Sequence, residues 1–141
     1  MINPGQALWY KTVFIADSED GGVTWQDLRP LTNVLGQCYG FAIGLSDGSV
    51  VVTHDHRYPP GTPCGRAMVS HDEGRTWQDE VYYLYYGMGQ SGYNQSVMLD
   101  ENEILTIAAT SNAKDDKQEQ LEGGRFVGNT DLTAIRWRLQ D

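Results

Sequence analysis

The sequence predicts an all-β protein assembled from a repeated unit of short strands. Its 16 Gly, 5 Pro, 8 Tyr and 4 Trp residues favour strands joined by tight turns. No stretch carries apolar residues at a sustained helical spacing. In addition, two segments that begin at Ser18 and Ser70 share the pattern S-x-D-x-G-x-T-W. A recurrence of this kind indicates a repeat architecture.

The shared pattern predicts a tight β-hairpin corner. Ser and Asp side chains accept hydrogen bonds from nearby backbone amides, glycine supplies a positive φ, and the Thr-Trp pair restarts a strand. The indole is expected to anchor the corner against the layer beneath it, while its N–H finds a partner. We therefore expect a structural role for the ten specified residues: Ser18, Asp20, Gly22, Thr24, Trp25, Ser70, Asp72, Gly74, Thr76 and Trp77.

The pattern resembles the Asp-box, or bacterial neuraminidase repeat, of the sialidase superfamily of β-propellers. The resemblance implies a partial β-propeller, with about two and a half to three four-stranded blades of a six-bladed ring. The blade boundaries expected are 8–35, 36–88 and 89–141. Since such a ring needs more blades, we expect either N-terminal blades beyond this segment or self-association to complete it, and favour the former.

Strands are expected in three groups. The first group holds 9–17 and 25–31; the second holds 39–45, 50–55, 66–70 and 77–85; the third repeats the opening of the second around Tyr93–Leu99 and Ile104–Ala109 and ends with 133–139. An Asp47-Gly48 turn between apolar runs signals a hairpin in the second group. A long polar insertion, Thr110 to Asp131, interrupts the third.

Antiparallel strands alternate their connections between the two ends of such units. The two boxes and the turns at 47–48 and 101–102 should share one end. The opposite end should receive the connections at 36–38, 54–65, 87–92 and 110–131. Long irregular loops are where binding residues concentrate, so a site is expected at this second end.

The richest chemistry at that end lies in His54-Asp55-His56-Arg57 and in Arg66. Arginine presents a planar fork that holds a carboxylate through two parallel hydrogen bonds, which suits an acidic sugar. Ordinary loop hydrogen bonding or ion pairing is the alternative for these residues. His54 and His56 could share a metal ion, but two ligands without a third are weak evidence, and we expect neither metal nor cofactor.

The resemblance also suggests roles for individual residues. Sialidases hold the substrate carboxylate with three arginines and attack with a tyrosine. The run Thr53-His54, Gly65-Arg66-Ala67, a box, then Gly92-Tyr93-Asn94-Gln95-Ser96 is similar to the family's run from its third arginine to its tyrosine. It implies that Arg66 binds substrate and that Tyr93 is the nucleophile. Arg57, His54 and Asp55 are expected to bind substrate beside Arg66 because they lie at the same end. Tyr39 occupies the repeat position equivalent to Tyr93, which favours a packing role instead.

The resemblance implies a glycoside hydrolase of the exo-α-sialidase type, inactive alone because the other arginines, the acid/base aspartate and the glutamate have no match here. The alternative is a non-catalytic glycan-binding or scaffold propeller; a hydrolase or lyase for another polysaccharide is a weaker possibility. A formal charge of −9 disfavours nucleic acid and anionic membranes as partners. Residues 1–11 show no signal peptide, so localisation stays open. Cys38 and Cys64 could pair, although free thiols are favoured.

Overall fold

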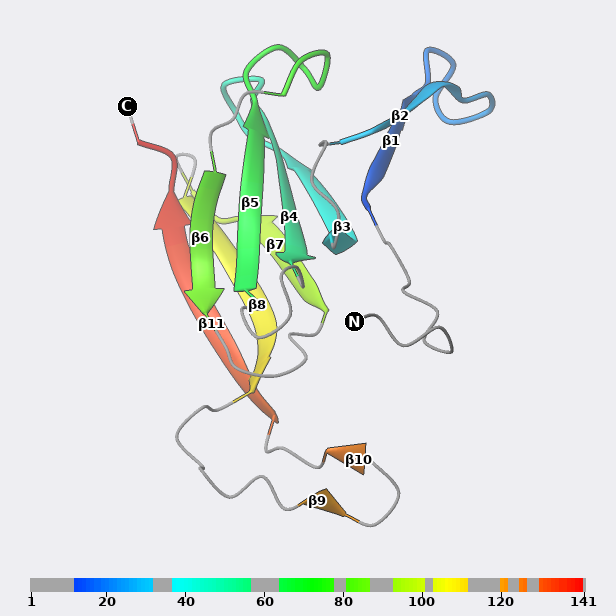
Figure 1. The fold of residues 1–141 in the computed structure, drawn as a ribbon. Coiled ribbons are helices and arrows are strands. Elements are labelled where there is room, and N and C mark those ends of the chain that lie inside the picture. Colours follow the sequence, from blue (N-terminus) through cyan, green and yellow to red (C-terminus); the bar gives the residue numbers. More distant parts are fainter. Residues whose placement is uncertain are drawn as a thin grey trace, which may run out of the picture.

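The structure, a computed structural model, describes residues 12–31, 37–56, 64–77, 81–86, 93–100, 103–111, 120–121, 125–126 and 130–140. Every regular element in them is a strand, which confirms the all-β prediction (Figure 1). The strands are β1 (Phe14–Asp17), β2 (Gln26–Pro30), β3 (Gln37–Gly44), β4 (Val50–His56), β5 (Cys64–Ser70), β6 (Val81–Tyr86), β7 (Asn94–Met98), β8 (Glu103–Ser111), β9 (Gln120–Leu121), β10 (Arg125–Phe126) and β11 (Thr130–Arg138). The expected start of the first strand, at Trp9, lies outside the described residues.

The strands form antiparallel sheets. A two-stranded sheet holds β1 and β2, a four-stranded sheet has the order β3-β4-β5-β6, and a three-stranded sheet has the order β11-β8-β7. This confirms the expected grouping into two, four and three strands. The short pair β9–β10 was not expected.

Several strand boundaries differ from the prediction. Polar residues assigned to the insertion belong to the three-stranded sheet, because Thr110 pairs with Asp131 and Ser111 with Thr130 at the far end of the β8–β11 ladder. Polarity does not prevent a residue from sharing a backbone ladder. Conversely, Trp77 lies outside the strands, and β6 starts only at Val81.

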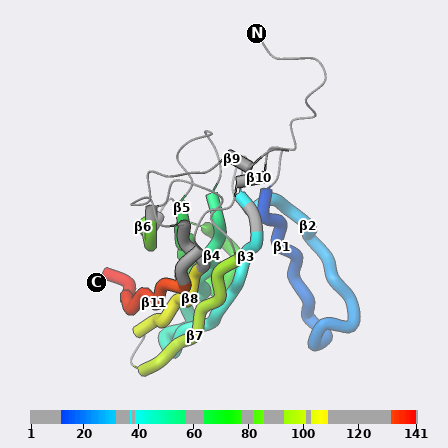
Figure 2. Tube along the Cα trace, turned by 90° about the horizontal axis from the view of Figure 1, so that it is seen from below, coloured from blue at the N-terminus to red at the C-terminus, as the bar shows by residue number. Residues whose placement is uncertain are grey.

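The four-stranded sheet lies between the other two, and each of its faces is covered by one of them (Figure 2). Strand alternation explains this, since successive side chains of β4 point to opposite faces. Val51 packs with Ile104 of the three-stranded sheet, whereas Val52 packs with Val13 and Ile15 of the two-stranded segment.

A line of hydroxyl groups runs through the contact between the four-stranded and three-stranded sheets. The Trp137 indole donates to Thr106 at 2.9 Å, the Thr106 and Ser96 hydroxyls lie 2.9 Å apart, and those of Ser96 and Thr53 lie 3.0 Å apart. Thr53, Ser96 and Thr106 are buried. Because each buried hydroxyl has a partner, the line fixes the relative position of the two sheets without a desolvation cost.

The two ends of the molecule differ. Figure 1 shows the β1–β2 corner, the β5–β6 corner and the β3–β4 turn at one end, and the β9–β10 pair at the other. We call the first the box end and the second the open end. His56 and Cys64 close the β4–β5 ladder at the open end.

Gly65 provides a test of the β5–β6 contact. A Cβ at this position would meet ring atoms of Tyr85, its ladder partner, at 2.0 Å. The tyrosine ring would have to move, so Gly65→Ala should lower the free energy of unfolding by about 1 to 3 kcal/mol. Gly44→Ala is the control, because a Cβ there meets nothing within 4 Å. Urea denaturation of both variants measures this, and equal stability would contradict the described packing.

Candidate functional site

The two S-x-D-x-G-x-T-W segments form corners with the same hydrogen bonds. In the second, Asp72 accepts from the Ser70 hydroxyl at 2.7 Å, the Thr76 amide at 2.8 Å and the Thr76 hydroxyl at 2.5 Å. In the first, Asp20 accepts from Ser18 at 2.9 Å, the Thr24 amide at 2.8 Å and the Thr24 hydroxyl at 2.6 Å.

These bonds stabilise the charged form of both carboxylates. The threonine hydroxyl is the largest cause, followed by the threonine amide, and together with the serine hydroxyl they lower the pKa of Asp20 and of Asp72 to about 2. Gly22 and Gly74 both have a positive φ, of 92° and 85°. The two segments are therefore one repeated structural unit.

The tryptophans of the two corners differ in burial. Trp25 and Trp77 each donate an indole hydrogen bond to a glycine carbonyl of their own corner, at 3.1 Å. Trp77 is half-buried against the cluster of Leu31, Val52 and Met68. Trp25 is 65% exposed, so within the described residues it does not pack against a layer beneath its corner, although its N–H has the expected partner. The physical reason is that no sheet of the described residues covers it.

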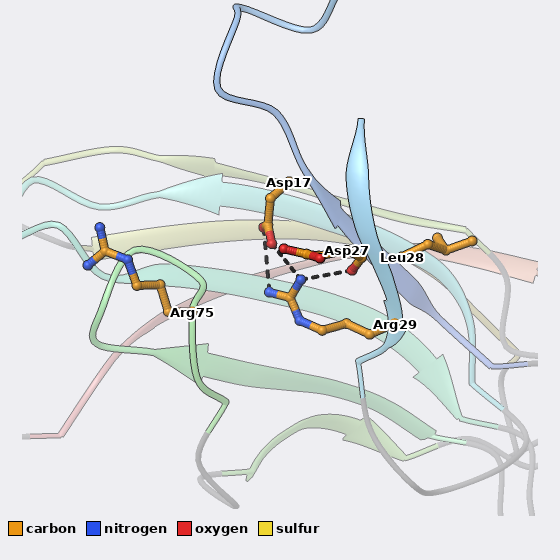
Figure 3. A pocket seen from close by; sticks show the side chains of 5 residues that line it. All are labelled: Asp17, Asp27, Leu28, Arg29 and Arg75. Atoms are coloured by element: carbon orange, nitrogen blue, oxygen red, sulfur yellow. Dashed lines mark hydrogen bonds and ion pairs between the residues drawn. The ribbon is translucent and has the colours of Figure 1, made fainter. Parts of the chain in front are cut away.

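The box end also holds an open depression of about 520 Å³ that the sequence analysis did not anticipate (Figure 3). Its lining consists of Asp17, Asp27, Leu28, Arg29 and Arg75. Arg29 binds Asp17 at 2.5 Å and donates to the Gly74 carbonyl at 3.1 Å. The guanidinium of Arg29 therefore connects the two-stranded sheet to the second corner.

At the open end, β4 holds His54 and Asp55, as the expected strand 50–55 implies, and it also holds His56, which was expected in the following loop. His54 and Asp55 are fully buried and His56 is 3% exposed. The reason is that the β4–β5 ladder continues through them, with His54 opposite Arg66. His54 and His56 share a face of β4, but no group of three His, Cys, Asp or Glu comes together in the part of the chain described here. Arg57 lies outside the described residues.

Arg66 is half-buried on β5. Its guanidinium donates to the Tyr83 hydroxyl at 2.9 Å, and its Cζ lies 4.6 Å from the centroid of the same ring. The Nε of Arg66 is buried and has no hydrogen-bond partner. The hydrogen bond to Tyr83 and the contact with its ring thus hold the Arg66 side chain in place, while the Nε–H donor of Arg66 has no acceptor.

Tyr93 immediately precedes β7 and is 69% exposed. Its ring contacts that of Tyr39, with centroids 4.3 Å apart and planes tilted by 51°. Tyr39 adopts a positive φ of 56°, at a bulge between Cys38 and Phe41, and this is an unusual conformation for a bulky residue. Tyr93 therefore contacts the β3 edge of the four-stranded sheet, whereas Arg66 contacts β6 at the other edge.

Asn94 is a feature that sequence reasoning missed. It is 4% exposed, and neither its amide nitrogen nor its amide oxygen has a hydrogen-bond partner. Leaving buried polar atoms unsatisfied costs about 1 to 3 kcal/mol, so such groups need an explanation. The sequence carries no signal for it, because β7 begins with three polar residues, Asn94, Gln95 and Ser96.

Cys64 has a buried, free thiol. The possible disulfide between Cys38 and Cys64 is therefore not formed.

No family model matches the chain. No curated protein matches it either. In the described ranges no helix is long and apolar enough to cross a membrane. The function proposed below is therefore inferred from the residues of this chain.

His54 should make stability depend on pH. Burial, with a smaller contribution from the nearby charges of His56 and Arg66, lowers the pKa of His54 to about 4. The unfolded chain binds a proton near pH 6.5, while the folded protein does not until near pH 4, so stability present above pH 6.5 is lost as pH falls through this window.

The expected loss is about 1.4 kcal/mol per pH unit inside the window. Urea denaturation at several pH values measures it. His54→Gln should flatten the dependence, whereas the exposed His71→Gln should leave it unchanged. A slope that survives in His54→Gln would show that another group causes it.

Proposed function

We propose that this chain is part of a sialidase-like glycoside hydrolase with β-propeller architecture, and that its open end contributes to binding a terminal anionic sugar. The observation that carries the proposal is the repeated corner: both S-x-D-x-G-x-T-W segments make the same carboxylate hydrogen bonds at the same end of neighbouring sheets. A scaffold of this kind leaves the opposite end for binding.

Arg66 is the proposed carboxylate ligand. Its fork is preoriented by the Tyr83 ring, and the buried Nε has no hydrogen-bond partner. Since the Tyr83 hydroxyl is a neutral acceptor, a sugar carboxylate would replace it with a charge-assisted bond, which is roughly twice as strong. His54 stays neutral above about pH 4, so Arg66 supplies the positive charge of this strand pair.

Tyr93 is the proposed nucleophile of the assembled enzyme. Its exposure suits a residue that meets a substrate. A phenol with a pKa of about 10 attacks poorly at neutral pH without a base. We propose that this base and the general acid come from residues other than those matched here, and that the 141-residue chain binds sugar without hydrolysing it.

A non-catalytic glycan-binding function is the second candidate, and the Tyr39–Tyr93 pair favours it. Two partly exposed rings in contact offer an apolar platform on which the C–H face of a sugar can stack. In this case Tyr93 would need its ring and not its hydroxyl.

Titration of the chain with N-acetylneuraminic acid, followed by NMR, tests the proposal. Arg66→Ala should weaken binding by about 10- to 100-fold, the effect of losing a charged hydrogen bond. Arg75→Ala is the matched control, because this arginine lies at the box end and pairs with Glu73 at 3.0 Å. A fluorogenic sialoside should remain uncleaved by the chain alone.

Equal binding of the uncharged N-acetylmannosamine, or full affinity in Arg66→Ala, would refute the proposed carboxylate site. Tyr93→Phe and Tyr93→Ala separate the two candidate functions. If the ring serves as a platform, Phe preserves sugar binding and Ala removes it. If Tyr93 acts only as a nucleophile, both variants bind as the unmodified chain does.

A further inference from the structure

The unequal burial of Trp25 and Trp77 indicates a missing neighbour. Both indoles lie in corners with the same hydrogen bonds, yet one is half-buried and the other is 65% exposed. Trp77 packs on the cluster in which Leu31, next to β2 of the preceding sheet, meets Val52 and Met68, and Val13 and Ile15 pack on the same cluster. By the same geometry, Trp25 should lie against an equivalent face.

Each sheet has two distinct faces. We call the face that packs on the preceding sheet the leading face, and the one that packs on the following sheet the trailing face. On the four-stranded sheet, Val52 and Met68 belong to the leading face, and Val51 and Val69 to the trailing face. Both sheet contacts inside the chain therefore join a trailing face to a leading face.

Two faces of the described sheets remain uncovered. The leading face of the two-stranded sheet carries Phe14, 56% exposed, at the end of β1 away from the Trp25 corner. The trailing face of the three-stranded sheet carries Val97, 51% exposed, and Ile107, 39% exposed. The ladder registers place Ile107 opposite Gln95 and Ala134, on the side away from the buried Ser96 and Thr106. The described sheets thus leave one leading face and one trailing face uncovered.

We propose that this chain binds a second copy of itself head to tail, with the Phe14 and Trp25 face of one copy on the Val97 and Ile107 face of the other. The contact repeats a type that the chain already makes twice, and a single chain offers both halves of it. Because the two halves differ, the association is heterologous and leads to a ring or an open stack.

The net charge of the chain determines how the proposed association depends on salt. With a net charge of −9, two copies repel each other at low ionic strength. Added salt screens this repulsion and strengthens apolar contacts, so association should increase with salt. An interface made chiefly of ion pairs would respond in the opposite direction.

Sedimentation velocity in high salt tests the proposal. The unmodified chain should show species heavier than its 15.8 kDa mass, in amounts that rise with concentration. Trp25→Lys and Ile107→Lys should each be monomeric. Their equimolar mixture should recover a species of two chains and none larger, because each variant keeps the face that the other lacks.

Val23→Lys is the control, since Val23 is 81% exposed at the tip of the corner and not on a strand face. It should associate as the unmodified chain does. Phe14→Lys serves as a second leading-face variant if Trp25→Lys disturbs its corner, and amide NMR spectra check that each variant is folded.

Three outcomes would overturn the proposal. One is a chain that stays monomeric at every concentration, as expected if other residues of a longer polypeptide cover these faces. Another is association that survives in both single variants. The third is a mixture that fails to recover the two-chain species, which would point to like faces binding each other.

Discussion

The packing of the four-stranded sheet on the two-stranded sheet depends on the hydrogen bonds that the Asp72 carboxylate accepts. They fix the corner after β5, and the corner in turn presents the Gly74 carbonyl to two donors, the Trp77 indole and the Arg29 guanidinium. The indole extends the apolar contact with Val52 and Met68. Arg29 connects the same corner to the two-stranded sheet through Asp17. A single turn thus supports both the sheet and its neighbour.

This arrangement separates structural from functional chemistry. Hydrogen-bonded carboxylates with low pKa values occupy the box end, where their charge is already satisfied by local donors. Incompletely satisfied groups occur at the open end, among them the Nε of Arg66 and the amide of Asn94. Natural structures tolerate such features mainly where a ligand or a function explains them.

Local patterns predicted local structure well. The box spacing and the Asp47-Gly48 turn predicted corners and a hairpin because these depend on residues close in sequence. Packing between sheets was harder. Nothing near His54 indicates that its side chain is buried, since its burial depends on β5, and the Tyr39–Tyr93 contact joins positions far apart in the chain. The exposure of Trp25 likewise depends on whether a sheet packs against it, and the S-x-D-x-G-x-T-W pattern does not determine that.

Both corners depend on the hydrogen bonds that their aspartate carboxylates accept. Carbon-detected NMR titration of the aspartate carboxyl groups measures this in one experiment. The pKa of Asp20 and that of Asp72 should both lie near 2, and Thr76→Val should raise only the second toward the ordinary value of 3.8. An Asp72 carboxyl that titrates in the ordinary range, or one that Thr76→Val leaves unchanged, would contradict the corner on which the fold is argued to depend.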